Sequence, residues 1–96
     1  MPDVVDNPAL SRLEIVEDIG VAVLEYRRLG DDRLDLVHTG VPAQFEGRGY
    51  GSALVKAALQ MARDEDLTVI PTCPYARAWI EKHPEAVEGL TVASPG

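Results

Sequence analysis

Three glycines at alternate positions are the residues whose spacing most clearly suggests chemistry in this sequence: Gly47, Gly49 and Gly51. They separate a segment expected to be extended from a segment with helical periodicity. Glycines let backbone N–H groups turn toward one point, and the first turn of a helix adds unpaired N–H donors and about half a positive charge. The spacing therefore predicts a phosphate or pyrophosphate site, with a tight turn that binds no ligand as the alternative.

The spacing also separates this loop from two common nucleotide-binding motifs. A P-loop needs Lys and then Ser or Thr directly after its last glycine, but Gly51 is followed by Ser52 and Ala53. A dinucleotide fingerprint needs G-x-G-x-x-G within a parallel βαβ unit. The glycines here are spaced G-x-G-x-G, and the strands before them are expected to be antiparallel, so this second motif fits poorly.

Few side chains could supply acid–base or nucleophilic groups, and His38 is one of only two histidines. It lies near the end of the strand that leads into the glycines, where it could act as a base. Strand alternation places it on one face with Leu34 and Leu36. A half-buried structural histidine is therefore the alternative.

Cys73 and Tyr75 belong to the start of a second predicted helix. Pro74 suits the first position of a helix, so Cys73 is expected at the N-cap, where the positive helix end favours a thiolate. The thiol could act as a nucleophile, accept a proton or simply cap the helix. Tyr75 could donate its hydroxyl proton, but its four-residue spacing from Trp79 also suits core packing.

The elements that must position these groups follow from local patterns. Leu13–Val16, Val21–Arg28 and Leu34–Val41 are predicted strands, and the turns between them are too short for a crossover helix. These strands are expected to form an antiparallel meander. Apolar residues at helical spacing predict a helix over Gly51–Arg63.

The second half of the chain continues the same pattern. Leu67–Ile70 is predicted to be a short buried strand that stops at Pro71, and the second helix runs from Pro74 until Pro84 closes it. Residues 1–12 are expected to be a loose lead-in and residues 86–96 a loose tail. The fold class is α/β: an antiparallel meander that continues into a mixed sheet, flanked by two main helices in a single domain over residues 1–96.

Composition narrows the possible functions. A net charge of −7 argues against general nucleic-acid binding, which needs clustered basic residues. No apolar run is long enough to span a bilayer, so we expect a cytoplasmic protein without membrane contacts. The single cysteine excludes an intrachain disulfide, and the sequence has no Cys and His cluster with metal spacing, so no metal is predicted.

Two motifs resemble a known family. HTGVPAQFEGRGYGSALV (His38–Val55) and CPYARAWIEKHPE (Cys73–Glu85) are similar to the small, acetyl-CoA-binding, single-domain branch of the GNAT-type N-acetyltransferases, the N-acetyltransferase domain-containing proteins. The similarity covers roughly residues 34–85. The GNAT fold is expected from it, with coenzyme A entering between two parallel strands that separate. Glu46 departs from the basic or amide residue usual in the superfamily, although an acidic residue is usual in this branch.

The resemblance implies roles for individual residues. Val41 would contact the pantetheine arm through its backbone, His38 and Cys73 would face the thioester, and Tyr75 would protonate the leaving thiolate. The resemblance assigns the pyrophosphate of coenzyme A to Glu46, Gly47, Arg48, Gly49, Tyr50, Gly51 and Ser52.

The implied function is an acetyl-CoA-dependent N-acetyltransferase that acts on a small-molecule or protein amine. Exposed sheet edges leave both a monomer and a weak homodimer as expected states. The superfamily mostly transfers acetyl directly, so a route through acetylated Cys73 is the minor hypothesis. One alternative is a non-catalytic acyl-CoA sensor. Another is a small interaction domain whose glycine loop is only a turn and whose Trp79 face binds a partner.

Overall fold

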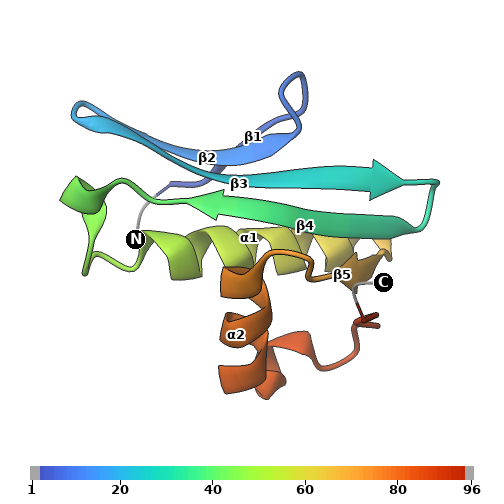
Figure 1. Cartoon of the computed structure of the whole chain (residues 1–96). Coiled ribbons are helices and arrows are strands. Elements are labelled where there is room, and N and C mark those ends of the chain that lie inside the picture. The colour runs from blue at the N-terminus through green and yellow to red at the C-terminus, as the bar shows by residue number, and fades with distance from the viewer. Residues whose placement is uncertain (1–2, 95–96) are drawn as a thin grey trace.

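The computed structural model describes residues 3–94, in which two helices pack against one face of a five-stranded sheet (Figure 1). The strand order is β1-β2-β3-β4-β5. The first four strands are antiparallel, and β5 is parallel to β4. Their bounds are Val5–Asn7 for β1, Arg12–Glu17 for β2, Gly20–Leu29 for β3, Arg33–Gly40 for β4 and Thr68–Ile70 for β5.

The predicted meander, mixed sheet and two helices are confirmed. Helix α1 spans Tyr50–Glu65 and α2 spans Pro74–Lys82. Their apolar faces cover the inner face of the sheet, so that side chains from both layers form one core. Its largest fully buried side chains are Ile15, Leu24, Leu34, Leu36, Phe45, Leu54, Val55 and Val69.

The N-terminal lead-in, expected to be loose, contains the short edge strand β1. Asp6 pairs with Leu13 of β2, and the hydroxyl of Tyr26 donates a hydrogen bond of 2.6 Å to the carboxylate of Asp6. The partners of β1 come from β2 and β3, and its three residues show no apolar alternation. Local pattern therefore could not reveal it.

The C-terminal tail is also more ordered than expected. A 3-10 helix spans Pro84–Val87, and Thr91 to Ala93 run beside β5. The amide of Val69 donates to Thr91 and its carbonyl accepts from the amide of Ala93, at 2.9 and 2.8 Å. The tail thus covers the outer edge of β5. Residues 95–96 of the predicted tail lie outside the described residues.

A β-bulge in β4 changes which side chains face the core. Tyr26 pairs with Leu36 and Glu25 pairs with His38, so Val37 is an extra residue with no partner in β3. The bulge turns His38 to the exposed outer face and places Thr39 on the inner face, opposite buried Leu24. The expectation that His38 shares a face with Leu34 and Leu36 is therefore wrong.

Strands β4 and β5 are paired over a short length only. The register ends at Asp35 and Ile70, after which the chain turns toward α2. The amide of Cys73 donates a 2.8 Å hydrogen bond to the carbonyl of Leu36 at this point. Within residues 3–94, the last part of β4, residues 37–40, has no strand partner on this side. That part of β4 leads directly to the glycines.

No helix within residues 3–94 is both long and apolar enough to cross a bilayer.

Tyr26 provides a stability prediction. Burial, and then its hydrogen bond to Asp6, raise the pKa of Tyr26 from 10.0 to about 12. Because the folded state holds this proton more tightly, the stabilisation is complete below about pH 10 and is lost as the pH rises through about 12. A pKa difference of this size corresponds to about 3 kcal/mol. We expect Tyr26→Phe to lower the free energy of unfolding by about 1 kcal/mol at neutral pH. The variant should also lose less stability than the wild type as the pH rises above about 10.

Urea unfolding of both proteins at neutral pH and at several alkaline pH values measures this difference. Tyr50 and Tyr75 are retained in both proteins, so their alkaline titration cancels in the comparison. Equal alkaline losses of stability in the two proteins would contradict this role of Tyr26.

Candidate functional site

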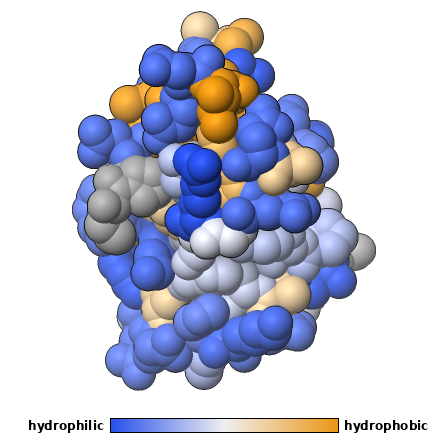
Figure 2. Space-filling model, turned by 90° about the vertical axis from the view of Figure 1, so that its left-hand side faces the viewer, coloured by the Kyte–Doolittle hydropathy of each residue, from blue (hydrophilic) through white to orange (hydrophobic). Residues whose placement is uncertain are grey.

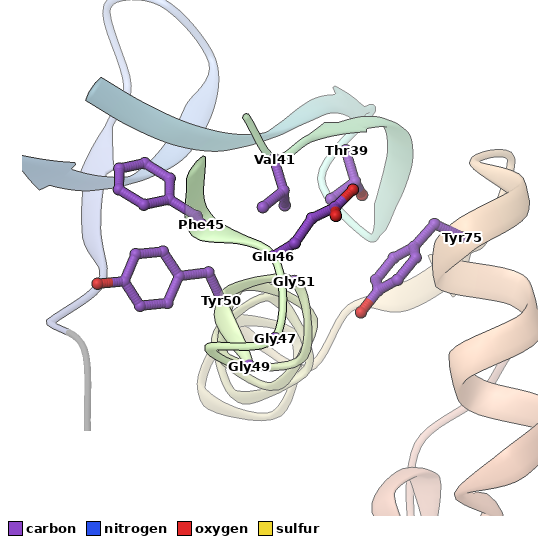
Figure 3. A pocket seen from close by; sticks show the side chains of 9 residues that line it. All are labelled: Thr39, Val41, Phe45, Glu46, Gly47, Gly49, Tyr50, Gly51 and Tyr75. Atoms are coloured by element: carbon purple, nitrogen blue, oxygen red, sulfur yellow. The ribbon is translucent and has the colours of Figure 1, made fainter. Parts of the chain in front are cut away.

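A pocket of about 360 Å³ lies where the end of β4, the start of α1 and the start of α2 meet (Figure 3). The glycine loop, defined as residues 46–52, forms one wall, and Tyr75 of α2 lies on the opposite side. The residues that line the pocket are Thr39, Val41, Phe45, Glu46, Gly47, Gly49, Tyr50, Gly51 and Tyr75.

The backbone of the glycine loop is shaped to present N–H groups. Gly47 and Gly49 have φ values of 78° and 76°, and a Cβ added to either would have no atom within 4 Å. Gly49 is the N-cap of α1 and supplies no capping side chain, and the first helical turn has no acidic residue. Five amides of the loop have no hydrogen-bond acceptor within residues 3–94: those of Gly47, Gly49, Tyr50, Gly51 and Ser52. Backbone donors arranged in this way can hold an anion.

Glu46 and Arg48 contribute differently from the glycines. Their amides donate to the carbonyls of Ala43 and Phe45, at 3.1 and 3.2 Å, so these two N–H groups are already used. The Glu46 side chain extends toward the Thr39 side of the pocket in Figure 3. Its negative charge opposes a phosphate, whereas the exposed guanidinium of Arg48 attracts one. The amides that remain able to bind an anion are therefore those of Gly47 and of residues 49–52.

The β2–β3 turn holds the loop from outside. The hydroxyl of Tyr50 donates to a carboxylate oxygen of Glu17 at 2.8 Å, and this hydrogen bond is the main cause of a raised pKa of Tyr50. The Gln44 side chain donates to the carbonyl of Ile19 at 2.8 Å, and the rings of Phe45 and Tyr50 lie 4.9 Å apart. These contacts fix the entry to α1 before any ligand binds.

Figure 2 views the molecule from the side on which the β2–β3 turn and the glycine loop lie. Hydrophobic side chains gather in the upper part of this view, and a band of weakly polar surface crosses the part below it. Val16, Ile19 and Val21, at the β2–β3 turn, are exposed. The apolar turn thus stands beside the loop that presents the amides.

Cys73 lies at the N-cap of α2, as predicted, but its side chain makes no capping hydrogen bond. The residue is only 3% exposed and is not among those that line the pocket. Its sulfur lies 3.4 Å from the hydroxyl of Thr39, which does line the pocket. Thr39 therefore stands between the pocket and the thiol.

Tyr75 faces the pocket and not the core. It is 43% exposed, whereas Trp79 on the same helix is 7% exposed and belongs to the core. Burial of the phenol, and then the nearby Cys73, raise the pKa of Tyr75. A Cβ added to Gly51 would lie 2.5 Å from the Tyr75 hydroxyl oxygen, so the glycine permits this close approach. Tyr75, from α2, thus holds a protonated hydroxyl beside the first turn of α1.

Trp79 joins the two helices behind the pocket. Its indole N–H donates to the Ser52 hydroxyl oxygen at 3.0 Å, and its ring stacks on His83 with a centroid distance of 4.2 Å. Ser52, predicted at the pyrophosphate, therefore holds α2 against α1 with its oxygen and keeps its own O–H proton free to donate. The buried position of Trp79 argues against this side chain as a partner surface.

His38 is a predicted site residue that lies on the other face of the sheet from the pocket. Arg48, Ser52 and Cys73 are also not among the residues that line the pocket. Its side chain is exposed on the outer face of the sheet, where Glu25 is its partner across β3 and β4. A Cβ added to Gly40 would lie 3.6 Å from its Nε2. The pocket thus gathers the loop amides and Tyr75, with Cys73 behind it and His38 on the opposite face.

Sequence reasoning missed Thr39 and Phe45. Regular strand alternation, without the bulge, predicts that Thr39 points away from the helices. Nothing in the local sequence marks Val37 as an extra residue. Phe45 is 1% exposed, and its ring packs against the ring of Tyr50 on the core side of the loop. An apolar aromatic residue in a polar, glycine-rich segment was the signal that could have identified Phe45.

Within residues 3–94, no group of three or more His, Cys, Asp or Glu residues is placed to hold a metal ion.

Comparison with solved structures gives a similar fold. The NMR solution structure of a Staphylococcus aureus protein described as GCN5-like matches with a TM-score of 0.74 and 24% identity, over 98% of this chain and 90% of that chain. At this identity the match supports the fold alone.

Sequence comparisons give relatives and a family. Protein NATD1 of Xenopus tropicalis and of Homo sapiens are each 41% identical to this chain over 63 residues, which is 66% of this chain and 58% and 56% of those proteins. Protein NATD1 of Danio rerio is 38% identical over 71 residues, 72% of this chain and 64% of that protein. The chain thus matches less than two thirds of the length of these relatives. The family model of the GCN5-related N-acetyl-transferases matches residues 12–90, a range that contains β2 to β5, the glycine loop and both helices, and the chain belongs to this family.

Proposed function

We propose that this domain binds acetyl-CoA and transfers its acetyl group to an amine. The observation that carries the proposal is the set of amides at Gly47, Gly49 and the first turn of α1 that have no hydrogen-bond acceptor within residues 3–94, in a segment that forms one wall of the pocket. Converging N–H groups at a helix N-terminus suit a diphosphate. A Cβ added to Gly47 or Gly49 would have no atom within 4 Å. There is therefore open space beside both glycines for a diphosphate, and the loop need not rearrange to bind one.

The pantetheine arm would follow the unpaired end of β4. Within residues 3–94, residues 37–40 have no strand partner on the side of α2, so the backbone groups that point to this side are available to the amide groups of the arm. Thr39 and Val41 line this route, and Tyr75 stands across from them. The bound acetyl-CoA supplies an electrophilic thioester. The Tyr75 hydroxyl, which lines the pocket, would donate a proton to the departing sulfur.

The acceptor amine would approach from the outer face of the sheet. His38 and Thr39 are neighbours on β4, and after the bulge their side chains point to opposite faces. A base on the outer face can take the proton of an amine that reaches the same part of β4. The net charge of −7 favours a cationic acceptor, such as a polyamine or a lysine side chain.

His38→Gln tests this role. Because His38 is exposed and water can partly replace it, we expect turnover to fall about 10-fold, less than the loss usual for an enclosed general base. The affinity for acetyl-CoA should stay unchanged, because His38 does not line the pocket. His83→Gln is the matched control and should leave turnover unchanged, since His83 stacks on Trp79 at the end of α2. Equal turnover of His38→Gln and the wild type would remove His38 from the mechanism.

Calorimetry with acetyl-CoA, followed by an assay of thiol release with a panel of amines, tests the function as a whole. Saturable binding with amine-dependent thiol release supports the proposal. Binding with no release beyond hydrolysis supports the alternative of a non-catalytic acyl-CoA sensor. Absence of binding would overturn both and favour a small interaction domain.

A further inference from the structure

Thr39 is the polar side chain that the β4 bulge brings into the pocket. It is partly buried, lines the pocket and lies across from buried Leu24 in the β3–β4 register. The Thr39 hydroxyl and the Cys73 thiol lie 3.4 Å apart. Within residues 3–94, neither group makes a hydrogen bond to any other side chain. The two groups therefore form an isolated pair, of which only Thr39 reaches the pocket.

The hydrogen-bonding capacity of this pair determines what it can do. A threonine hydroxyl has one proton to donate and accepts two hydrogen bonds, whereas a thiol is a weak donor. If the Cys73 S–H donates to the Thr39 oxygen, the Thr39 proton is left to point away from Cys73. The pocket is the open direction, because Cys73 is 3% exposed and closes the other side.

We propose that the Thr39 hydroxyl donates a hydrogen bond to the carbonyl oxygen of the bound acyl thioester, and that Cys73 is a positioning residue that orients this hydroxyl. The inference rests on the proposed function. Such a donor stabilises the negative charge that gathers on the carbonyl oxygen when the amine attacks. No covalent bond forms at Cys73, and acetyl passes directly from sulfur to nitrogen.

The burial of Cys73 supports direct transfer. Cys73 is 3% exposed and belongs to the hydrophobic core, so an acetyl group on its sulfur would have to displace neighbouring core side chains. The Cys73 amide also holds the backbone of Leu36 at 2.8 Å, so the start of α2 is tied to β4. Cys73 is thus fixed where it can orient its neighbour but cannot readily carry a group.

The test is the infrared spectrum of bound acetyl-CoA labelled with ¹³C at the thioester carbonyl. In the wild type, the hydrogen bond should lower the carbonyl frequency relative to free acetyl-CoA. Thr39→Val, which keeps the shape of the side chain, should abolish this shift and leave the affinity within about 2-fold. It should lower kcat about 10-fold, the upper end of the usual net contribution of one neutral hydrogen bond. Thr39→Ser should restore both the shift and the rate.

Cys73→Ala separates positioning from covalent catalysis. It should lower kcat about 3-fold in the wild type but cause no further loss in the Thr39→Val background, because the two groups act as one unit. Intact-protein mass spectrometry after incubation with acetyl-CoA should show no acetylated Cys73. Acetyl-CoA that binds with an unshifted carbonyl, an unchanged rate in Thr39→Val, or an acetyl group on Cys73 would each overturn the inference while the proposed function stands. Absence of acetyl-CoA binding by the wild type would overturn both.

Discussion

Gly49→Val is expected to weaken acetyl-CoA binding by at least about 100-fold, which corresponds to about 3 kcal/mol. Gly49 is the N-cap of α1 with a φ of 76°, where a β-branched residue is strained. Its side chain would also enter the pocket, because Gly49 is one of the lining residues. Isothermal titration calorimetry measures the change, and Gly49→Ala should give an intermediate loss.

Gly89→Val is the matched control. Gly89 has a φ of 81°, a Cβ added there would have no atom within 4 Å, and the residue does not line the pocket. Both valine variants should lose a similar amount of stability, about 1–2 kcal/mol, by thermal unfolding. Only Gly49→Val should lose binding. If both variants bind acetyl-CoA as well as the wild type, the glycine loop is not the pyrophosphate site.

Tyr75→Phe is expected to lower turnover about 100-fold, the lower end of the usual range for a general acid. Burial, and then Cys73, raise the pKa of Tyr75, so the phenol keeps its proton at neutral pH and remains able to donate it. Acetyl-CoA affinity should change little, because the ring stays in place. Steady-state kinetics with direct measurement of Kd separates the two effects.

The pH profile adds a second readout for Tyr75. If the phenol is the acid, wild-type kcat should fall on the alkaline side only above the ordinary tyrosine value of 10.0. That alkaline fall should be smaller in the variant, where only the loss of stability caused by Tyr26 above about pH 10 remains. Tyr26→Phe removes a hydroxyl that lies outside the pocket and should keep full turnover at neutral pH. Full turnover by Tyr75→Phe would assign the proton to another group.

The sequence was most informative where structure is local. The spacing of Gly47, Gly49 and Gly51 before an amphipathic segment predicted both the loop and α1, because backbone freedom and helical periodicity are properties of neighbouring residues. Pro74 likewise predicted the start of α2 and the N-cap position of Cys73, which the structure confirms.

Pairings between distant residues could not be predicted in the same way. Strand β1 depends on Leu13 and Tyr26, and the tail depends on Val69. The bulge at Val37 arises from the register of two strands, and shifting the register by one residue exchanges the faces of all later side chains. For this reason the sequence placed His38 on the core face and missed Thr39.

The run of Thr91 to Ala93 beside β5 sets a practical limit on how the domain can be shortened. Val69 is the central residue of a strand of only three residues, and both its N–H and its C=O bond to this run. A truncation before Thr91 would strip these bonds and expose a strand edge able to recruit other chains. Strand β5 leads through Pro71 into α2. Removing the C-terminal residues would therefore also destabilise the position of α2, which carries Tyr75 at the pocket.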